Sequence, residues 1–581
     1  MTEYSHAEIE ALLTAPGAPF ELEPLELNGI QLRTFKHAPL TLPGIFEATV
    51  RFNEREYLVY EDERVTYAQA RALVEKIAGA LQAMGVEKGD RVAIAMRNYP
   101  EAVIAFWAIV HIGGVAVPMN AWWGSEELGF ALEDCGAAAL FADRERWARV
   151  AAGAIPRALR HAIVCRGEPS NTGGIKVSSW STLLEGEPAT PFTPVALSPE
   201  DNATLFYTSG TTGRPKGALG THRNICLHVM NGAYARARTL LRAGEPLPDP
   251  TDVQPQKTAL LTVPLFHVTG CHSILVSGTA GGNKIVMMYR WDPTQALALI
   301  ERERVTAFGG VPTVAWQILE SPHLASTDTS SVESIGYGGA PAAPELVARI
   351  QAAFPAVQPG TGYGLTESSS AVTVNSGADY IAHPDSVGLT LPCCELQIID
   401  EDGMPLPPGE RGELLVRGPV VFKGYWQRDE ATAETITPEG WLRTGDIARI
   451  DSDGFVYILD RAKDMIIRGG ENVYCVEIED TLFSHADVVD AAVYGVPHRT
   501  LGEEVAAAVQ LKRGATTTAE ALQAHVAEHL AHFKVPQHMR LYAEPLPRNP
   551  NGKILKRALA EAHTGEGQTH TLGEWSSGDG V

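Results

Sequence analysis

The sequence predicts an α/β fold with a large N-terminal part and a smaller C-terminal part. From about residue 45, short apolar strands alternate with helical segments, the pattern of parallel sheets covered by helices. The chain has 581 residues, too many for one hydrophobic core, so at least two domains are expected. From about residue 385, short strands and tight turns replace the alternation, which predicts a β-rich subdomain.

The first half of the chain signals its helices and strands clearly. Thr66 and Gln69 have the arrangement of a capping box, and the helix that they open is expected to end at Gly85. Pro100 is expected to begin a second helix. Apolar runs predict strands at residues 92–96, 113–118, 137–142 and 162–165.

The second half first continues this pattern. Strands are predicted at residues 259–263, 284–288 and 306–308, a helix at 293–303, turns at strand ends at 309–312 and 334–341, and a helix from Glu345. The β-rich region that follows contains predicted strands at residues 395–399, 413–416 and 455–458.

A charged stretch at residues 460–464 separates two apolar strands and is the predicted domain boundary. The expected N-terminal domain therefore covers residues 1–459, with the β-rich subdomain at about 385–459. A compact C-terminal α+β domain follows at 460–563. Residues 564–581 are rich in Gly, Ser and Thr and are expected to form a disordered tail.

Composition argues against several classes of function. The net charge of −23 makes the chain a poor nucleic-acid binder, since such proteins neutralise phosphates. The sequence contains no apolar run of about 20 residues, so no transmembrane helix is predicted. The polar, acidic N-terminus does not resemble a signal peptide. Seven scattered cysteines without a CxxC pair argue against a zinc site or a disulfide framework. A cytoplasmic protein is expected.

The densest cluster of glycines, hydroxyls and cations lies at residues 207–217, called here the phosphate loop. Glycines let the backbone approach a ligand closely, while hydroxyls, amides and cations can hold a polyphosphate. A Walker motif would end in Gly-Lys-Ser/Thr, whereas Pro215 precedes Lys216 here and Gly217 follows it. By itself the stretch is also compatible with a flexible surface loop. Its candidate ligand groups are Thr208, Ser209, Gly210, Thr211, Thr212, Gly213, Arg214 and Lys216.

A second cluster covers residues 362–367. Two glycines, Gly362 and Gly364, bracket Tyr363, and Thr366 and Glu367 follow. A tyrosine ring can stack on a base, a threonine hydroxyl can donate to a phosphoryl oxygen, and a carboxylate is a suitable ligand for Mg²⁺. A lone hexapeptide of this kind is more often a turn than a site.

The two clusters, with residues 441–447, 460–474 and 547–556, resemble the signatures of the adenylate-forming superfamily. The resemblance is closest to its acyl-CoA synthetase branch, and it implies that ATP, Mg²⁺ and CoA are used. It assigns Tyr363 and the turn Gly338, Gly339, Ala340 and Pro341 to the adenine side. It also assigns Thr366 to the α-phosphate, Glu367 and Thr208 to Mg²⁺, and Asp446 and Arg461 to the ribose.

The resemblance also implies a moving C-terminal domain. Lys463 corresponds to the hinge, and Gly469, Gly470 and Glu471 lie where the pantetheine arm of CoA would enter. Lys553 corresponds to the catalytic lysine that contacts the carboxylate and the α-phosphate, whereas Lys556 is expected to be an ordinary charge. Cys475 stands where the family usually has proline and is expected to be a tolerated small substitution, although an exposed thiol there would be reactive.

The acyl pocket implied by the resemblance contains His267, Gly270, Gly309, Gly310, Val311 and Gly338. His267 is also compatible with a structural role in the core. The expected pocket is an apolar tunnel without a Lys or Arg for a second carboxylate, which favours a medium- or long-chain fatty acid. Aryl-CoA ligases of the benzoate or coumarate type, an adenylating enzyme that serves a carrier protein or another acceptor, and a luciferase-like oxygenase stay open. Expected partners are the acid, ATP and CoA, and a homodimer is open.

Overall fold

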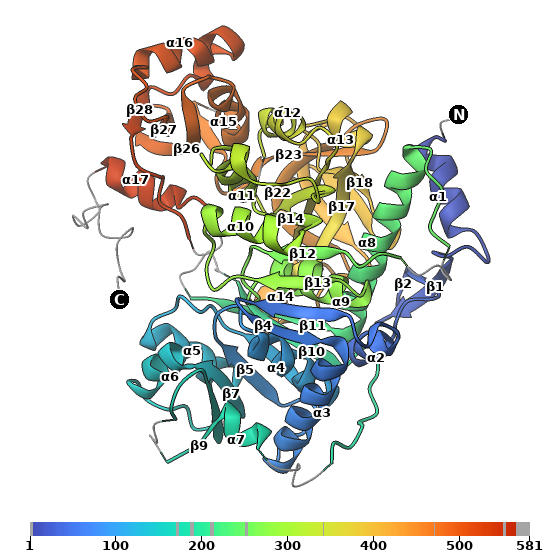
Figure 1. The fold of residues 1–581 in the computed structure, drawn as a ribbon. Helices are drawn as coiled ribbons and strands as arrows, with labels where there is room; N and C mark the ends of the chain where they lie inside the picture. The colour runs from blue at the N-terminus through green and yellow to red at the C-terminus, as the bar shows by residue number, and fades with distance from the viewer. Residues whose placement is uncertain are drawn as a thin grey trace.

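The computed structural model describes residues 4–169, 174–185, 191–208, 214–249, 254–340, 342–469, 471–549 and 553–564. It confirms the predicted α/β class, with sheets of parallel and mixed strands covered by helices. Figure 1 shows the C-terminal elements, in orange and red, as a smaller lobe at one end of the molecule.

The first large sheet has eight strands in the order β21-β11-β10-β6-β5-β7-β8-β9. Its middle strands are parallel, whereas β10 and β11 pair in antiparallel fashion. The strands are β5 (Arg91–Ala95), β6 (Val115–Pro118), β7 (Ala139–Asp143), β8 (His161–Cys165), β9 (Lys176–Ser179), β10 (Asn202–Thr208), β11 (Lys216–Thr221) and β21 (Gly424–Tyr425).

The second large sheet has thirteen strands in the order β19-β20-β22-β23-β18-β17-β16-β15-β14-β12-β13-β3-β4. Strands β3 and β12 to β16 are parallel, and the predicted β-rich region extends the sheet with antiparallel strands. The bounds are β3 (Glu56–Tyr60), β4 (Glu63–Thr66), β12 (Thr258–Leu261), β13 (Lys284–Met287), β14 (Ala307–Gly310), β15 (Ser334–Gly338), β16 (Gln358–Leu365), β17 (Ser370–Ser376), β18 (Gly388–Thr390), β19 (Glu395–Ile399), β20 (Gly412–Arg417), β22 (Leu442–Ile450) and β23 (Phe455–Arg461).

Helices bury the faces of these sheets. One core joins the helices α3 (Tyr67–Ala83) and α4 (Pro100–His111) to strands of both large sheets, and Trp107 of α4 lies fully buried within it. A second core packs α10 (Pro293–Glu303), α11 (Pro312–Leu319) and α12 (Pro344–Ala353) on the second sheet. The other elements of this part are α1 (His6–Thr14), β1 (Leu22–Leu27), β2 (Ile30–Phe35), α2 (Leu42–Glu47), η1 (Ala48–Phe52), α5 (Ser125–Cys135), α6 (Arg144–Ala151), α7 (Trp180–Leu184), α8 (His222–Arg242), the π-helix η2 (Thr269–Val276), α9 (Ser277–Ala280), η3 (Leu324–Ser326), η4 (Thr366–Ser368), α13 (Ala378–Ala382) and α14 (Asp429–Thr435).

The C-terminal lobe has its own five-stranded sheet and its own core. Its elements are β24 (Ile466–Arg468), β25 (Glu471–Val473), α15 (Cys475–Phe483), β26 (Val488–His498), β27 (Gly502–Leu511), α16 (Ala519–His529), η5 (His532–Lys534), β28 (His538–Tyr542) and α17 (Lys556–Thr564). One contact with the large part is the stacked pair Phe483 and Trp316, whose ring centroids lie 6.4 Å apart at an angle of 10°. The division into domains stays a prediction, and β23 includes Asp460 and Arg461 beyond the predicted boundary.

Local sequence signals located the elements well. The capping box of Thr66 and Gln69 is present, α3 ends at Ala83 just before Gly85, and α4 begins at Pro100 as predicted. All seven cysteines are free and buried. Within the described ranges, no helix combines the length and apolarity needed to cross a membrane.

Candidate active site

A cavity of about 1880 Å³ brings most of the predicted site residues together. The large part contributes Lys216, Glu367 and His267, and the C-terminal lobe contributes Lys553. Residues that lie more than 300 positions apart in the sequence therefore face one space. The other predicted site residues in its wall are Thr208, Gly309, Gly310, Val311, Gly338, Gly339, Gly362, Gly364, Thr366, Arg461 and Lys463.

The phosphate loop joins two antiparallel strands rather than a strand and a helix. Thr208 ends β10, Lys216 begins β11, and the two residues are register partners in the hairpin. The ammonium group of Lys216 lies 5.2 Å from the centre of the Tyr425 ring, a cation–π distance. Ser209, Gly210, Thr211, Thr212 and Gly213 lie outside the described residues. The two ends of the loop thus face the cavity, while the contacts of its centre stay a prediction.

Glu367 is held at the cavity wall by a tyrosine. Its short helix η4 follows directly on strand β16, so residues 362–365 form part of a strand and not the turn that an isolated hexapeptide suggests. The hydroxyl of Tyr425 donates a hydrogen bond of 2.7 Å to Oε1 of Glu367. Burial and the charge of Glu367 raise the pKa of Tyr425, which keeps this hydroxyl protonated. A carboxylate fixed in this way, with Thr366 and Thr208 on the same cavity, fits a hard cation such as Mg²⁺.

Asp446 lies in the middle of strand β22 and is only 2% exposed, so it is not a turn residue. Arg461 is its register partner on β23, and its Nε lies 2.6 Å from Oδ1 of Asp446. The hydroxyl of Tyr363 donates to Oδ2 at 2.5 Å. Burial raises the pKa of Asp446, and the charge of Arg461 opposes this shift. The two predicted ribose residues and the predicted adenine residue therefore form one hydrogen-bonded group.

The adenine-side turn depends on glycine where two strands approach closely. A Cβ atom at Gly338 would lie 2.5 Å from the carbonyl oxygen of Gly362 on the neighbouring strand. Gly339 has φ +75°, a conformation that side chains disfavour. Ala340 follows in the same turn, and Pro341 lies outside the described residues.

Lys553 reaches the cavity from a loop of the C-terminal lobe. Its amide donates to Oδ1 of Asn549 at 2.9 Å, and the Asn549 amide donates to the Lys553 carbonyl oxygen at 2.8 Å. Desolvation and the positive charge of Arg461 lower the pKa of the Lys553 ammonium group. When protonated, the Lys553 ammonium group is a cationic hydrogen-bond donor that suits anionic groups.

The predicted CoA residues lie apart from this cavity. Gly469 has φ +62°, and its amide donates to the carbonyl oxygen of Leu501 at 2.8 Å. Glu471 is an exposed residue at the start of β25, and neither residue lines the cavity. Gly470 lies outside the described residues. The structure therefore brings Lys553 to the other site residues, whereas Gly469 and Glu471 lie away from them.

Lys556 and Cys475, near the predicted hinge residue Lys463, make contacts that stabilise the structure. Lys556 forms a 2.7 Å ion pair with Glu479 within the lobe, so it is not the solvated charge that its sequence context suggests. Cys475 is fully buried, and its thiol donates to the carbonyl oxygen of Asp464 at 3.1 Å. Burial raises the pKa of this thiol, which agrees with the expectation of a tolerated small substitution at this position and not with an exposed, reactive thiol.

His267 is neutral and has a defined tautomer. Its Nδ1 accepts a hydrogen bond of 3.3 Å from the Thr269 amide, so the proton is on Nε2. Burial lowers the pKa of His267 to about 4. Gly270 does not line the cavity; a Cβ atom there would collide with the carbonyl oxygen of Pro264. Gly309 is needed for a similar reason, because its Cβ would collide with the carbonyl oxygen of Gly336.

Several cavity residues were not predicted from the sequence. His228 and Val229 line it from α8, and Ser370 lines it from β17. The sequence shows which residues of α8 share a helical face, from their four-residue spacing, but it does not show which face points toward the ligand. Five further cations line the cavity: Arg51, Arg55, Arg236, Lys257 and Arg443. That none of them binds a second carboxylate of the acid stays a prediction.

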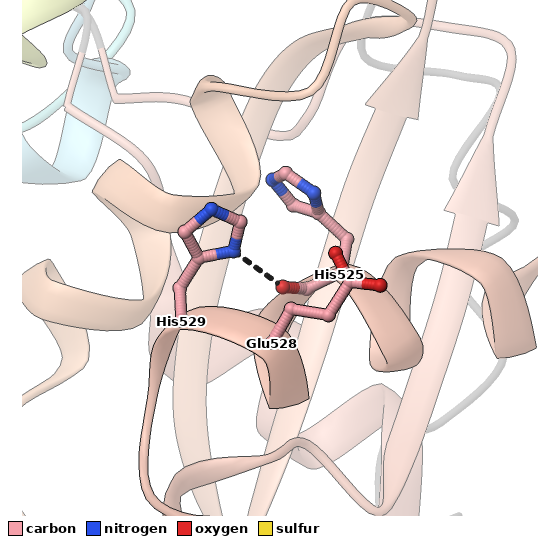
Figure 2. A group of neighbouring side chains, drawn as sticks. All are labelled: His525, Glu528 and His529. Carbon is pink, nitrogen blue, oxygen red and sulfur yellow. Dashed lines mark hydrogen bonds between the residues drawn. The ribbon is translucent and has the colours of Figure 1, made fainter.

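A further group of metal-ligating side chains lies on the C-terminal lobe. His525, Glu528 and His529 of α16 have ligand atoms within 4.8 Å of one another, and Figure 2 shows them gathered on one helix. His525 already bonds through Nε2 to Ser484, and Nδ1 of His529 bonds to the carbonyl oxygen of His525. None of the three lines the cavity, so they are separate from the predicted Mg²⁺ residues.

Comparisons with known proteins agree with this geometry. A family model described as AMP-binding enzyme matches residues 45–426, and one described as AMP-binding enzyme C-terminal domain matches residues 477–553. Feruloyl-CoA synthase of Amycolatopsis sp is 36% identical over 85% of this chain and 92% of its own length. Long-chain-fatty-acid–CoA ligase FadD13 of Mycobacterium tuberculosis is 35% identical over 87% and 94%. The crystal structure of the anthranilate CoA ligase AuaEII in complex with anthranoyl-AMP has a TM-score of 0.80 and 25% identity, covering 91% of this chain and 99% of that one.

Proposed function

Since the chain belongs to the AMP-binding enzyme family, we propose that its large cavity is where a carboxylic acid is joined to coenzyme A. The protein is an acid–thiol ligase that uses ATP and Mg²⁺ and forms an acyl-adenylate. One observation carries the assignment of the site: Lys553 of the C-terminal lobe shares a cavity with Glu367, Arg461 and His267 of the large part.

In the first half-reaction, a carboxylate oxygen of the acid attacks the α-phosphorus of ATP. A new P–O bond forms, the bond to the β-phosphate oxygen breaks, and pyrophosphate leaves with its electron pair. Both reactants are anionic, so their repulsion is a large part of the barrier. The ammonium group of Lys553 would reduce it where charge develops, and one such contact is worth about 3 kcal/mol. Thr366 and Lys216 would donate to phosphoryl oxygens from the opposite wall.

Mg²⁺, when bound, would neutralise phosphate charge. Glu367 would hold it with a carboxylate oxygen, and Thr208 would supply a second oxygen. Tyr425 would keep the Glu367 carboxylate facing the cavity through its 2.7 Å hydrogen bond. His267, neutral and protonated on Nε2, would donate a hydrogen bond to the carboxylate of the acid without adding charge.

In the second half-reaction, the thiolate of CoA attacks the acyl carbon and AMP leaves, which gives the thioester. Lys553 would have to leave the cavity first, and Lys463 at the cavity wall is the proposed hinge. Gly469, Gly470 and Glu471 would then face the adenylate. The separation of Gly469 and Glu471 from the cavity supports a model in which the two half-reactions use different lobe positions.

The acid belongs to one of two classes. A medium- or long-chain fatty acid is supported by the similarity to the long-chain-fatty-acid–CoA ligase FadD13. An aryl acid is supported by the similarity to feruloyl-CoA synthase and by an imidazole in the cavity wall, described below. A carrier protein as acyl acceptor stays an alternative.

The role of Lys553 is tested by Lys553→Ala. Acid-dependent exchange of pyrophosphate into ATP should fall at least a hundredfold, because the contact present in the transition state is lost. Thioester formation from a supplied acyl-adenylate and CoA should keep most of its rate. Equal loss in both assays would contradict the assignment, and the control Lys512→Ala, on the same lobe but outside the cavity, should change neither.

A panel of acids tests the acceptor. Pyrophosphate release should depend on the acid, and a CoA thioester should accumulate when CoA is present. Acid-dependent release without a thioester would favour a carrier protein or another acceptor over CoA.

A further inference from the structure

A buried histidine in the cavity wall has no hydrogen-bond partner. His228 lies on α8, is 6% exposed, and lines the cavity. Its Nδ1 atom is buried without a partner, and no described residue bonds to its Nε2 atom. Buried polar groups are nearly always paired in native proteins, so this imidazole calls for an explanation.

The imidazole is neutral and can both donate and accept. Burial lowers the pKa of His228 to about 4, so at neutral pH one ring nitrogen carries a proton and the other has a free lone pair. The neighbouring His272 bonds through Nδ1 to the carbonyl oxygen of Ser369 at 3.1 Å, and its Nε2 atom is likewise buried without a partner among the described residues. A neutral ring of this kind suits a neutral oxygen substituent better than a second carboxylate, which prefers a cationic partner.

The surroundings of His228 belong to the acid-binding side of the cavity. Val229 and Gly232 of α8 also line the cavity, and neither has a polar side-chain atom. The hydroxyls of Ser273 and Ser370, which also line the cavity, bond to each other at 2.7 Å, which uses one of their two donors. Of the two histidines, His228 is the one that lines the cavity, and its Nδ1 atom has no partner among the described residues.

We propose that His228 is a specificity residue that binds an oxygen substituent of the acid, a hydroxyl, ether or carbonyl group separate from the reacting carboxylate. This proposal rests on the proposed function and names the substrate class more closely, as an oxygen-substituted acid and not a plain hydrocarbon acid. A buried polar group that is left unpaired is destabilising. A site built to bond a substrate hydroxyl therefore discriminates strongly against the analogue that lacks it.

Matched pairs of acids test the proposal in the whole enzyme. One pair is 4-hydroxycinnamic acid and cinnamic acid, and the other is 12-hydroxydodecanoic acid and dodecanoic acid, so that both frameworks are covered. The ratio of kcat/KM within each pair is measured by pyrophosphate release. We expect the oxygen-substituted member to be preferred at least tenfold in one pair or both.

Three variants separate hydrogen bonding from shape. His228→Leu should reduce the preference to within threefold, mainly by lowering kcat/KM for the oxygen-substituted acid. His228→Gln keeps a donor and an acceptor and should retain part of the preference. Val229→Leu alters the same wall without polar atoms and should change both members of a pair by the same factor. The melting temperature of His228→Leu should not fall, because an unpaired polar group is removed.

The outcomes distinguish the two proposals. If no acid in any assay releases pyrophosphate, the proposed function fails. If acids are activated but the members of both pairs react equally well, or if His228→Leu keeps the wild-type preference, the role of His228 is overturned while the ligase assignment stands. Loss of preference in His228→Leu with retention in His228→Gln supports the proposal.

Discussion

At the scale of single residues, the cavity is organised by side chains that hold other side chains. Tyr425 bonds to Glu367 and stacks against the ammonium group of Lys216, so it links the predicted metal ligand to the end of the phosphate loop. Arg461 and Tyr363 together occupy both oxygens of Asp446. If Asp446 accepts hydrogen bonds from the ribose as predicted, the ribose hydroxyls would have to share or replace its bonds to Arg461 and Tyr363. Asp446 would then be a preorganised acceptor that changes partners when ATP binds.

The first prediction concerns Tyr425. Tyr425→Phe removes the hydroxyl that donates to Glu367, and a hydrogen bond to a charged group is worth about 1.5–3 kcal/mol. We expect kcat/KM for ATP to fall at least tenfold, and the Mg²⁺ concentration for half-maximal pyrophosphate release to rise. The control is Tyr457→Phe, whose hydroxyl bonds to Asp451 outside the cavity at 3.0 Å. Similar Mg²⁺ dependence in both variants would show that Tyr425 does not position the metal ligand.

At the scale of elements, the close approach of strands β14, β15 and β16 shapes the floor of the cavity. Their facing positions are glycines because the backbones leave no room for a Cβ atom at Gly309 or Gly338. Gly336 on β15 differs, since a Cβ there would have its nearest heavy atom 4.0 Å away. The glycines of one strand therefore do not have equal roles, although in the sequence they look alike.

The second prediction uses this difference. Gly338→Ala should destabilise the protein by about 1–3 kcal/mol, because neighbouring backbone must move. It should also raise KM for ATP if the turn contacts adenine. Gly336→Ala is the matched control and should leave the melting temperature nearly unchanged. Thermal unfolding and ATP kinetics of the two variants check this, and equal melting temperatures would contradict it.

At the scale of the whole molecule, the contact between the lobes contains acidic groups. α15 carries Phe483, which stacks on Trp316, and one turn earlier it carries Asp480. Burial raises the pKa of Asp480 to about 8, and the charges of Glu479, Asp385 and Glu477 act in the same direction. Asp385 belongs to the large part, so keeping the lobes together favours protonated Asp480.

The third prediction follows from the sign of this shift. Well below pH 4, Asp480 is protonated in both the folded and the unfolded protein, so its ionisation does not lower the free energy of unfolding. As the pH rises from its ordinary pKa of 3.8 toward 8, the folded state binds a proton that the unfolded state has lost, so stability falls across this window. Asp480→Asn should therefore raise the melting temperature at pH 7.5 and leave it nearly unchanged at pH 4. The exposed Asp402→Asn is the control, and a gain of equal size at both pH values would be the wrong outcome.

The sequence by itself determined the order of helices and strands and the chemical types at the site. Capping at Thr66, the start of α4 at Pro100 and the motifs around Lys216, Glu367 and Lys553 are local patterns, so they could be read without a fold. Only the tertiary structure decided which of these groups meet. Tyr425 reaches Glu367 from a distant strand, Gly270 faces backbone instead of the cavity, and His228 lacks a partner. Periodicity specifies which face of an element is apolar, but contacts between distant segments depend on how all the layers pack.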